Sequence, residues 1–178
     1  MIRTFLLGFV LLITACSKEE VAGGDGSSQL PQDKQPEEVE TLSDTQLLDL
    51  TQSQTFTYFW DYAHPDSGAA RERYHPSDPN FDAHTVTMGG TGFGLMAIIV
   101  GVERGYISRA AALEHLKTLL HFLENADRFH GAWPHWLNGE TGKTLAFSKK
   151  DNGGDLVETA FLVQGLLTVA EYFRDGNT

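Results

Sequence analysis

The stretch GFGLMAIIVGVE, residues 92–103, decides how the fold is read. Almost every side chain in it is apolar, so the segment has no polar face to turn towards water. It ends just before Gly105, a residue type that favours the end of a helix. A helix that is hydrophobic on all sides is buried in a larger assembly. We therefore predict an inner helix over these residues and an all-α fold around it.

Three further helices are expected around this inner helix. Apolar and aromatic residues recur at helical spacing over residues 47–62, and a fourth apolar helix is expected over residues 156–173. Ser108 is a favourable N-cap for the third helix. That helix carries one apolar stripe, made of Leu113, Leu116, Leu119, Leu120 and Leu123. Short turns on one side and long loops on the other predict about four helices of an incomplete α/α toroid in residues 45–178.

The first 15 residues have the pattern of a secretory signal peptide. Their apolar run, residues 5–13, is about half of the ~20 residues that a membrane-spanning helix needs. The only cysteine, Cys16, follows Ile13-Thr14-Ala15, and this run resembles the lipobox of bacterial lipoproteins. The alternative is an ordinary secretory leader with a chance cysteine. We expect acylation of Cys16 and an outer membrane lipoprotein, at the cell surface or on the periplasmic face, held by the lipid anchor only.

Residues 16–44 are expected to form an acidic, disordered linker. From Ser17 to Asp44 the chain has eight acidic residues and two lysines, which account for −6 of the formal net charge of −11. This segment is rich in Gly, Ser, Gln and Pro and cannot bury enough apolar area to fold. The remaining chain is only mildly acidic and has no basic stripe, which argues against nucleic acid as a partner.

Two motifs in the folded region are set aside. Residues 92–97 match the glycine pattern of a dinucleotide-binding fingerprint, but that fingerprint follows a β-strand, whereas the flanking chain here is helical. Close helix packing is the better explanation of these glycines. His130 and His135 are five residues apart and have no third ligand nearby, unlike the helical zinc motif. We therefore expect no metal site.

The long loop of residues 126–154 and the start of the last helix hold the strongest candidates for function. Trp133 and Trp136 flank His135, and exposed indoles can stack on sugar rings; burial of these aromatics as loop anchors is the alternative. Asp151, Asp155 and Glu158 are spaced by four and then three residues, which would gather them on one helical face. Paired carboxylates serve glycoside hydrolysis, but Asp155 and Glu158 also fit a capping box.

Several separated motifs occur together in a fixed order. They are Thr91-Gly92-Phe93-Gly94-Leu95, Gly101-Val102-Glu103-Arg104-Gly105, His130-Gly131, Trp133-Pro134-His135 and Asp155-Leu156-Val157-Glu158-Thr159-Ala160-Phe161-Leu162. With them the chain resembles, over about residues 47–173, the glucoamylase-like glycoside hydrolases that include bacterial endo-β-1,2-glucanases. The resemblance implies an (α/α)6 toroid, hydrolysis of a β-linked glucan with inversion, and neither a metal nor an organic cofactor.

The resemblance also assigns candidate residues by position. They are Asp155, Glu158 and Asp151 for catalysis, and Trp133, His135, Trp136 and Arg73 for substrate binding, with Arg73 the weaker candidate. Members of this family are much longer than this chain, and further acidic residues are expected on later inner helices. The chain is therefore expected to be an N-terminal part whose acid and base pair is incomplete.

Three functions stay open on the sequence. The first is hydrolysis of a β-linked glucan, with β-1,2-glucan favoured. The second is a non-catalytic cell-surface lipoprotein that binds glycan. The third is a truncated product that folds poorly, because four helices would leave apolar side chains such as Ile98, Ile99 and Val100 half covered.

Overall fold

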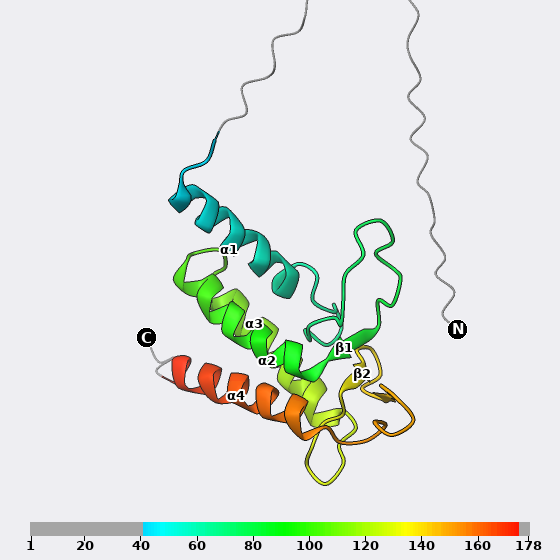
Figure 1. Cartoon of the computed structure of the whole chain (residues 1–178). Helices are drawn as coiled ribbons and strands as arrows, with labels where there is room; N and C mark the ends of the chain where they lie inside the picture. Colours follow the sequence, from blue (N-terminus) through cyan, green and yellow to red (C-terminus); the bar gives the residue numbers. More distant parts are fainter. Residues whose placement is uncertain (1–40, 175–178) are drawn as a thin grey trace, which may run out of the picture. The chain divides into compact units, whose positions relative to one another are not determined.

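The computed structural model describes residues 41–174 (Figure 1). The expected signal peptide, the acylation site Cys16 and the linker up to residue 40 lie outside the described residues and stay predictions. Among the helices that are described, none combines the length and the apolar character that a membrane span requires.

Four helices form the framework, and they confirm the predicted all-α class. They are α1 (Asp44–Trp60), α2 (Met88–Glu103), α3 (Arg109–Asn125) and α4 (Leu156–Tyr172). Figure 1 shows α1, α2 and α4 side by side, with α3 behind them. The core between them is made mainly of Leu95, Ile98, Leu116, Leu119, Leu123 and Leu162, each at most 6% exposed. This is the arrangement expected for neighbouring inner and outer helices of a toroid.

The starts of three helices follow from local capping. Ser43 and Gln46 form a capping box at the start of α1. The Ser108 side chain accepts a hydrogen bond from the backbone N–H of Ala111 (3.1 Å), as predicted for α3. Asp155 accepts from the backbone N–H groups of Val157 and Glu158 at the start of α4. Each cap satisfies helix N–H groups that have no partner within their own helix.

Glycines let α2 and α4 pack with their backbones in contact. A Cβ atom added to Gly92 would lie 2.2 Å from the carbonyl oxygen of Phe161, and one added to Gly165 would lie 2.4 Å from the carbonyl oxygen of Gly92. The glycines of this stretch therefore serve helix packing. One face of α2 is open, with Phe93 52% and Val100 36% exposed, as expected when only four helices are present. The expectation that Ile98 would be half covered is wrong, because Ile98 is 2% exposed.

The two long loops contain a small sheet that was not predicted from the sequence. Its strands β1 (Thr85–Thr87), β2 (Trp136–Asn138) and β3 (Thr144–Leu145) are antiparallel in the order β1-β2-β3. Val86 pairs with Leu137 at the centre, and both side chains are fully buried. Because β1 leads directly into α2, the sheet fixes the second loop against the end of the helical layer where α2 and α4 begin (Figure 1).

Candidate active site

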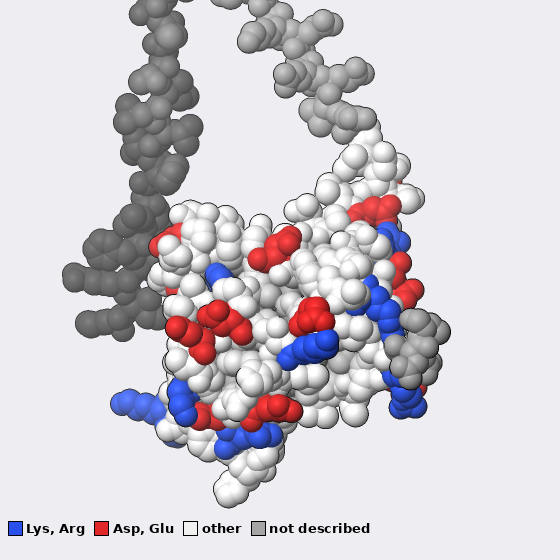
Figure 2. Space-filling model, turned by 180° about the vertical axis from the view of Figure 1, so that it is seen from behind, with Lys and Arg blue, Asp and Glu red and all other residues white. Residues whose placement is uncertain are grey.

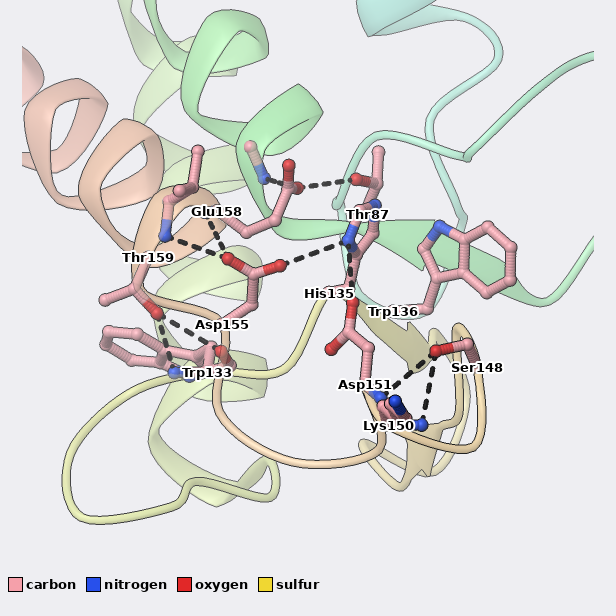
Figure 3. A network of polar contacts seen from close by, with 12 residues as sticks. Thr87, Trp133, His135, Trp136, Ser148, Lys150, Asp151, Asp155, Glu158 and Thr159 are labelled. Atoms are coloured by element: carbon pink, nitrogen blue, oxygen red, sulfur yellow. Dashed lines mark hydrogen bonds and ion pairs between the residues drawn. The ribbon is translucent and has the colours of Figure 1, made fainter.

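His135 is the centre of a polar network at the end of the helical layer where α2 and α4 begin (Figure 3). Its Nδ1 atom lies 3.2 Å from Oδ2 of Asp155 and 3.5 Å from Oδ2 of Asp151. The backbone carbonyl of His135 also accepts a hydrogen bond from the N–H of Met88 (3.3 Å). The imidazole is thus placed between two carboxylates by the junction of the second loop with α2.

Asp155 is held on both sides of its carboxylate. Oδ1 accepts hydrogen bonds from the N–H groups of Val157 (2.8 Å) and Glu158 (3.0 Å), while Oδ2 is turned towards His135. Its own backbone N–H donates to the carbonyl of Trp133 (2.8 Å). The side chain is 18% exposed. Asp155 therefore caps α4 and presents a fixed carboxylate oxygen at the site, so both roles considered from the sequence are compatible.

Asp151 reaches the same imidazole from a tight turn. Ser148 and Asp151 exchange two backbone hydrogen bonds (3.1 and 3.2 Å), and the Ser148 hydroxyl accepts a further bond from the Asp151 N–H (3.2 Å). This turn follows Phe147, whose ring stacks on the His135 ring at a centroid distance of 4.2 Å. Asp151 is thus brought to His135 by loop geometry.

Glu158 makes different contacts from the two aspartates. Its Oε2 atom accepts hydrogen bonds from the backbone N–H of Gly89 (2.7 Å) and from the hydroxyl of Thr87 (3.0 Å), at the start of α2. The expected capping box is therefore only half formed: Asp155 caps α4, but Glu158 caps α2. We expected three carboxylates on one face of a helix. Asp151 and Asp155 do lie close together, but they precede α4, and Glu158 points to the start of α2 instead.

The two loop tryptophans lie in different surroundings. The Trp133 backbone N–H donates to the Thr159 hydroxyl (2.9 Å), and its Nε1–H donates to the carbonyl of Leu123 (3.4 Å). The Trp133 ring also packs against the hydrophobic core. These contacts are those of a loop anchor, the alternative raised for the aromatic residues. A sugar-binding role for Trp133 stays a prediction.

Trp136 lies beside the carboxylate network. Its ring contacts Phe147 edge to face at 4.8 Å and His135 at 5.7 Å between centroids. Its Nε1–H donates to Oε2 of Glu72 (3.1 Å), and Glu72 also pairs with Arg73 through Oε1 (3.2 Å). Glu72, in the loop between α1 and β1, and Trp136, in the loop between α3 and α4, are more than 60 residues apart in sequence, and the two loops meet at Trp136. Figure 3 shows Trp136 beside His135.

Phe147 and Glu72 are site residues that sequence reasoning missed. Phe147 is 48% exposed, although it is a large aromatic residue. An aromatic residue four positions before Asp151, in a polar loop, was a usable signal for it. For Glu72 the sequence offered none, because its partner Trp136 is brought to it by the pairing of β1 with β2.

His135, Asp151 and Asp155 are also the one described set with metal-ligand chemistry, since a ligand atom of each lies within 4.8 Å of the others. His130 is not part of this set. His135 Nδ1 already has a hydrogen-bond contact with Asp155 at 3.2 Å and lies 3.5 Å from Asp151, so contacts within the protein also explain the arrangement. The described residues thus give no separate support for a metal.

Charges on the opposite side of the molecule are mixed. Figure 2 shows acidic and basic side chains interspersed on the face seen from behind, without a continuous basic area. Exposed ion pairs of the described residues include Lys117 with Glu114 (2.7 Å) and Lys143 with Asp127 (3.1 Å). This face gives no support for binding nucleic acid.

Comparison with known proteins finds relatives that are named for hydrolysis of β-1,2-glucan. It is 48% identical, over 137 residues, to an exo β-1,2-glucooligosaccharide sophorohydrolase of Parabacteroides distasonis. The match covers 76% of this chain but only 18% of that protein. No family model matches the chain.

Solved structures give the same result for the fold. An endo-β-1,2-glucanase from Chitinophaga pinensis, in complex with sophorotriose and glucose, is 60% identical with a TM-score of 0.74. The match covers 77% of this chain and 33% of that one. A glucoamylase candidate from Bacteroides caccae is 56% identical with a TM-score of 0.73, covering 76% and 33%. The resemblance seen in the sequence motifs is confirmed, and the chain corresponds to the N-terminal third of the solved chains.

Proposed function

We propose that this chain is the N-terminal part of a glycoside hydrolase that acts on β-1,2-linked glucan. The observation that carries the proposal is the network of His135, Asp151 and Asp155, which holds two carboxylates beside the exposed ring of Phe147 and the partly buried ring of Trp136. Similarity to proteins named for β-1,2-glucan hydrolysis supports the substrate class. The chain covers a third or less of their lengths, so the activity belongs to the longer protein.

The spacing of the two aspartates bears on the mechanism. One oxygen of each lies within 4.8 Å of the other, together with His135 Nδ1. An inverting hydrolase separates its acid and base by ~6.5–9.5 Å, which leaves room for the attacking water. Asp151 and Asp155 are too close to act as the acid and the base of that arrangement. We therefore assign both to the same role, either the acid or the base. The opposite carboxylate is then Glu158 or an acidic residue outside this chain.

Trp136 and Phe147 supply the binding surface in this proposal. Their rings meet edge to face, and Phe147 is half exposed beside the two aspartates. An aromatic face packs against the C–H groups of a sugar ring while the neighbouring carboxylates accept hydrogen bonds from its hydroxyl groups. A glucose unit on this surface would bring its glycosidic oxygen towards Asp151 and Asp155.

We also propose that the protein is a lipoprotein of the outer membrane, acylated at Cys16. The support for this is the sequence pattern of residues 1–16. Expression with labelled palmitate tests it: label is expected in the wild-type chain and absent from Cys16→Ala. Label in both variants, or in neither, contradicts acylation at this residue. Protease treatment of intact cells then distinguishes the cell surface from the periplasmic face.

The hydrolase proposal is tested with a chimera that joins this chain to the part of the Chitinophaga pinensis glucanase that follows the matched third. We expect the chimera to release oligosaccharides from linear β-1,2-glucan and not from linear β-1,3-glucan. Binding of β-1,2-glucan by a folded chimera without any cleavage would favour the non-catalytic glycan-binding lipoprotein instead.

A further inference from the structure

Glu72 lies in the early loop and is fastened to the sheet. Its backbone N–H donates to the carbonyl of Thr85 (2.9 Å), the first residue of β1. The preceding residue is tied to α1, because the Tyr58 hydroxyl donates to the carbonyl of Arg71 (2.7 Å). Burial, and next the charge of Glu72, raise the pKa of the Tyr58 phenol. The backbone that carries Glu72 is thus held from two directions.

The two oxygen atoms of the Glu72 carboxylate have different partners. Oε2 accepts the Nε1–H of Trp136 (3.1 Å), and Oε1 accepts from the guanidinium of Arg73 (3.2 Å). Indole has a single hydrogen-bond donor, so this bond fixes the rotation of the Trp136 ring. The Glu72 side chain is 22% exposed and the Arg73 side chain 55% exposed. One partly shielded carboxylate therefore contacts both Trp136, which lies beside His135, and the exposed Arg73.

We propose that Glu72 is a positioning residue for sugar binding, which holds the Trp136 indole as a preformed platform and keeps the Arg73 guanidinium beside it. The inference rests on the proposed function, since a β-linked glucan is the ligand. A ring already held in its binding orientation loses less conformational freedom when the ligand arrives. A bond to a charged acceptor is stronger than a neutral one, which suits this task.

Arg73 gains a defined role from the same contact. Its guanidinium has five N–H donors, and the pair with Glu72 uses only part of them. The remaining donors can bond the hydroxyl groups of a sugar that stacks on Trp136. Glu72 therefore sets both the apolar and the polar contact of one glucose unit.

The binding test uses the 178-residue chain and sophorotriose, followed by calorimetry. We expect Glu72→Ala and Trp136→Ala each to weaken binding about tenfold, because each removes one well-placed contact or its support. The double variant should lose less than the sum of the two single losses, since Glu72 acts in part through Trp136. Glu72→Gln keeps an acceptor oxygen for the indole and should lose less than Glu72→Ala. Glu114→Gln, which removes an exposed acid on α3, is the matched control and should bind as the wild type does.

Additive losses in the double variant, or unchanged binding in Glu72→Ala, would overturn the proposal. A second measurement needs no ligand: the indole N–H signal of Trp136 in an NMR spectrum of the 15N-labelled chain. Glu72→Ala should shift this signal and speed its exchange with water, with the Trp60 and Trp133 signals unchanged. If neither the chain nor the chimera binds sophorotriose, the proposed function fails, while an unmoved indole signal would overturn the role of Glu72 by itself.

Discussion

The start of α4 and the outward face of α4 differ in how far their side chains find partners within the protein. Around the start of α4, Asp155, Glu158 and His135 all have hydrogen-bond partners within the described residues. On the outward face, large apolar side chains are open to solvent. They include Leu156 (78%), Val157 (64%), Leu167 (63%) and Val163 (38%).

The same contrast holds for the groove between α3 and α4. It has a volume of about 470 Å³ and is lined almost wholly by aliphatic side chains, with Lys117 the charged exception. Contiguous exposed apolar patches mark interaction surfaces or sites of aggregation. The polar end thus forms a self-consistent unit, whereas the apolar face has the properties of a surface that other protein covers. Stability and site geometry should therefore respond to different substitutions.

The largest effect is expected from a matched pair of leucines on α4. Leu162 is fully buried and Leu167 is 63% exposed. Leu162→Ala should lower the free energy of unfolding by about 2–5 kcal/mol, because it removes core packing and leaves a cavity. Leu167→Ala should change it by less than ~0.5 kcal/mol, as at other exposed positions. Urea unfolding of both variants measures this, and equal losses would show that the outward face is covered in solution.

The next largest effect concerns the contact of α2 with α4. Gly92→Ala places a methyl group 2.2 Å from the carbonyl oxygen of Phe161, so the helices must move apart. We expect a loss of about 1–3 kcal/mol of unfolding free energy, the usual cost of overpacking. Gly153→Ala is the control, because its added atom meets only ordinary contacts at 3.7 Å. A stable Gly92→Ala variant would mean that the two helices pack less closely than described.

A smaller effect separates the two roles of Asp155. Asp155→Ala removes the N-cap of α4 and should lower the unfolding free energy by about 0.5–2 kcal/mol. Asp155→Asn keeps an acceptor oxygen for Val157 and Glu158 and should stay close to the wild type in stability. Thermal unfolding of the two variants decides this. Equal destabilisation would show that the charge facing His135, and not the cap, stabilises the fold.

The smallest effect is a dependence of stability on pH. Burial lowers the pKa of His64 and of His115 below the ordinary 6.5. For each histidine, the unfolded chain therefore binds more protons than the folded one at pH values between the lowered pKa of the folded state and the ordinary pKa of 6.5. Stability should be complete above about pH 6.5 and fall as the pH drops through the lower folded values. His115→Gln should flatten this dependence in urea unfolding between pH 5 and pH 7, and an unchanged slope would contradict the assignment.

The helices were largely predictable because their signals are local. Ser108 and Asp155 stand directly before apolar runs, and α3 and α4 begin immediately after them. The start of α2 was placed one turn too late, at Gly92, because its cap is the side chain of Glu158, 69 residues further along the chain from Gly89. Local propensity carries no information on such a cap.

The site was predictable in its residues but not in its connections. Asp151, Asp155, His135 and Trp136 were singled out, and the structure brings them together. What the sequence did not reveal is the register that makes this possible: strands of two and three residues are too short to give an alternating pattern. Glu72 meets Trp136 only through that pairing, so its role required the structure.

The most direct test of the account compares the chimera carrying Asp155→Asn with the unaltered chimera on linear β-1,2-glucan. The substitution keeps the cap of α4 but removes the charge that faces His135. We predict that hydrolysis falls by about 100-fold or more, as expected for loss of a group that transfers a proton, while the folded state is retained. A folded Asp155→Asn chimera that cleaves β-1,2-glucan at the unaltered rate would contradict the assignment of this network to catalysis.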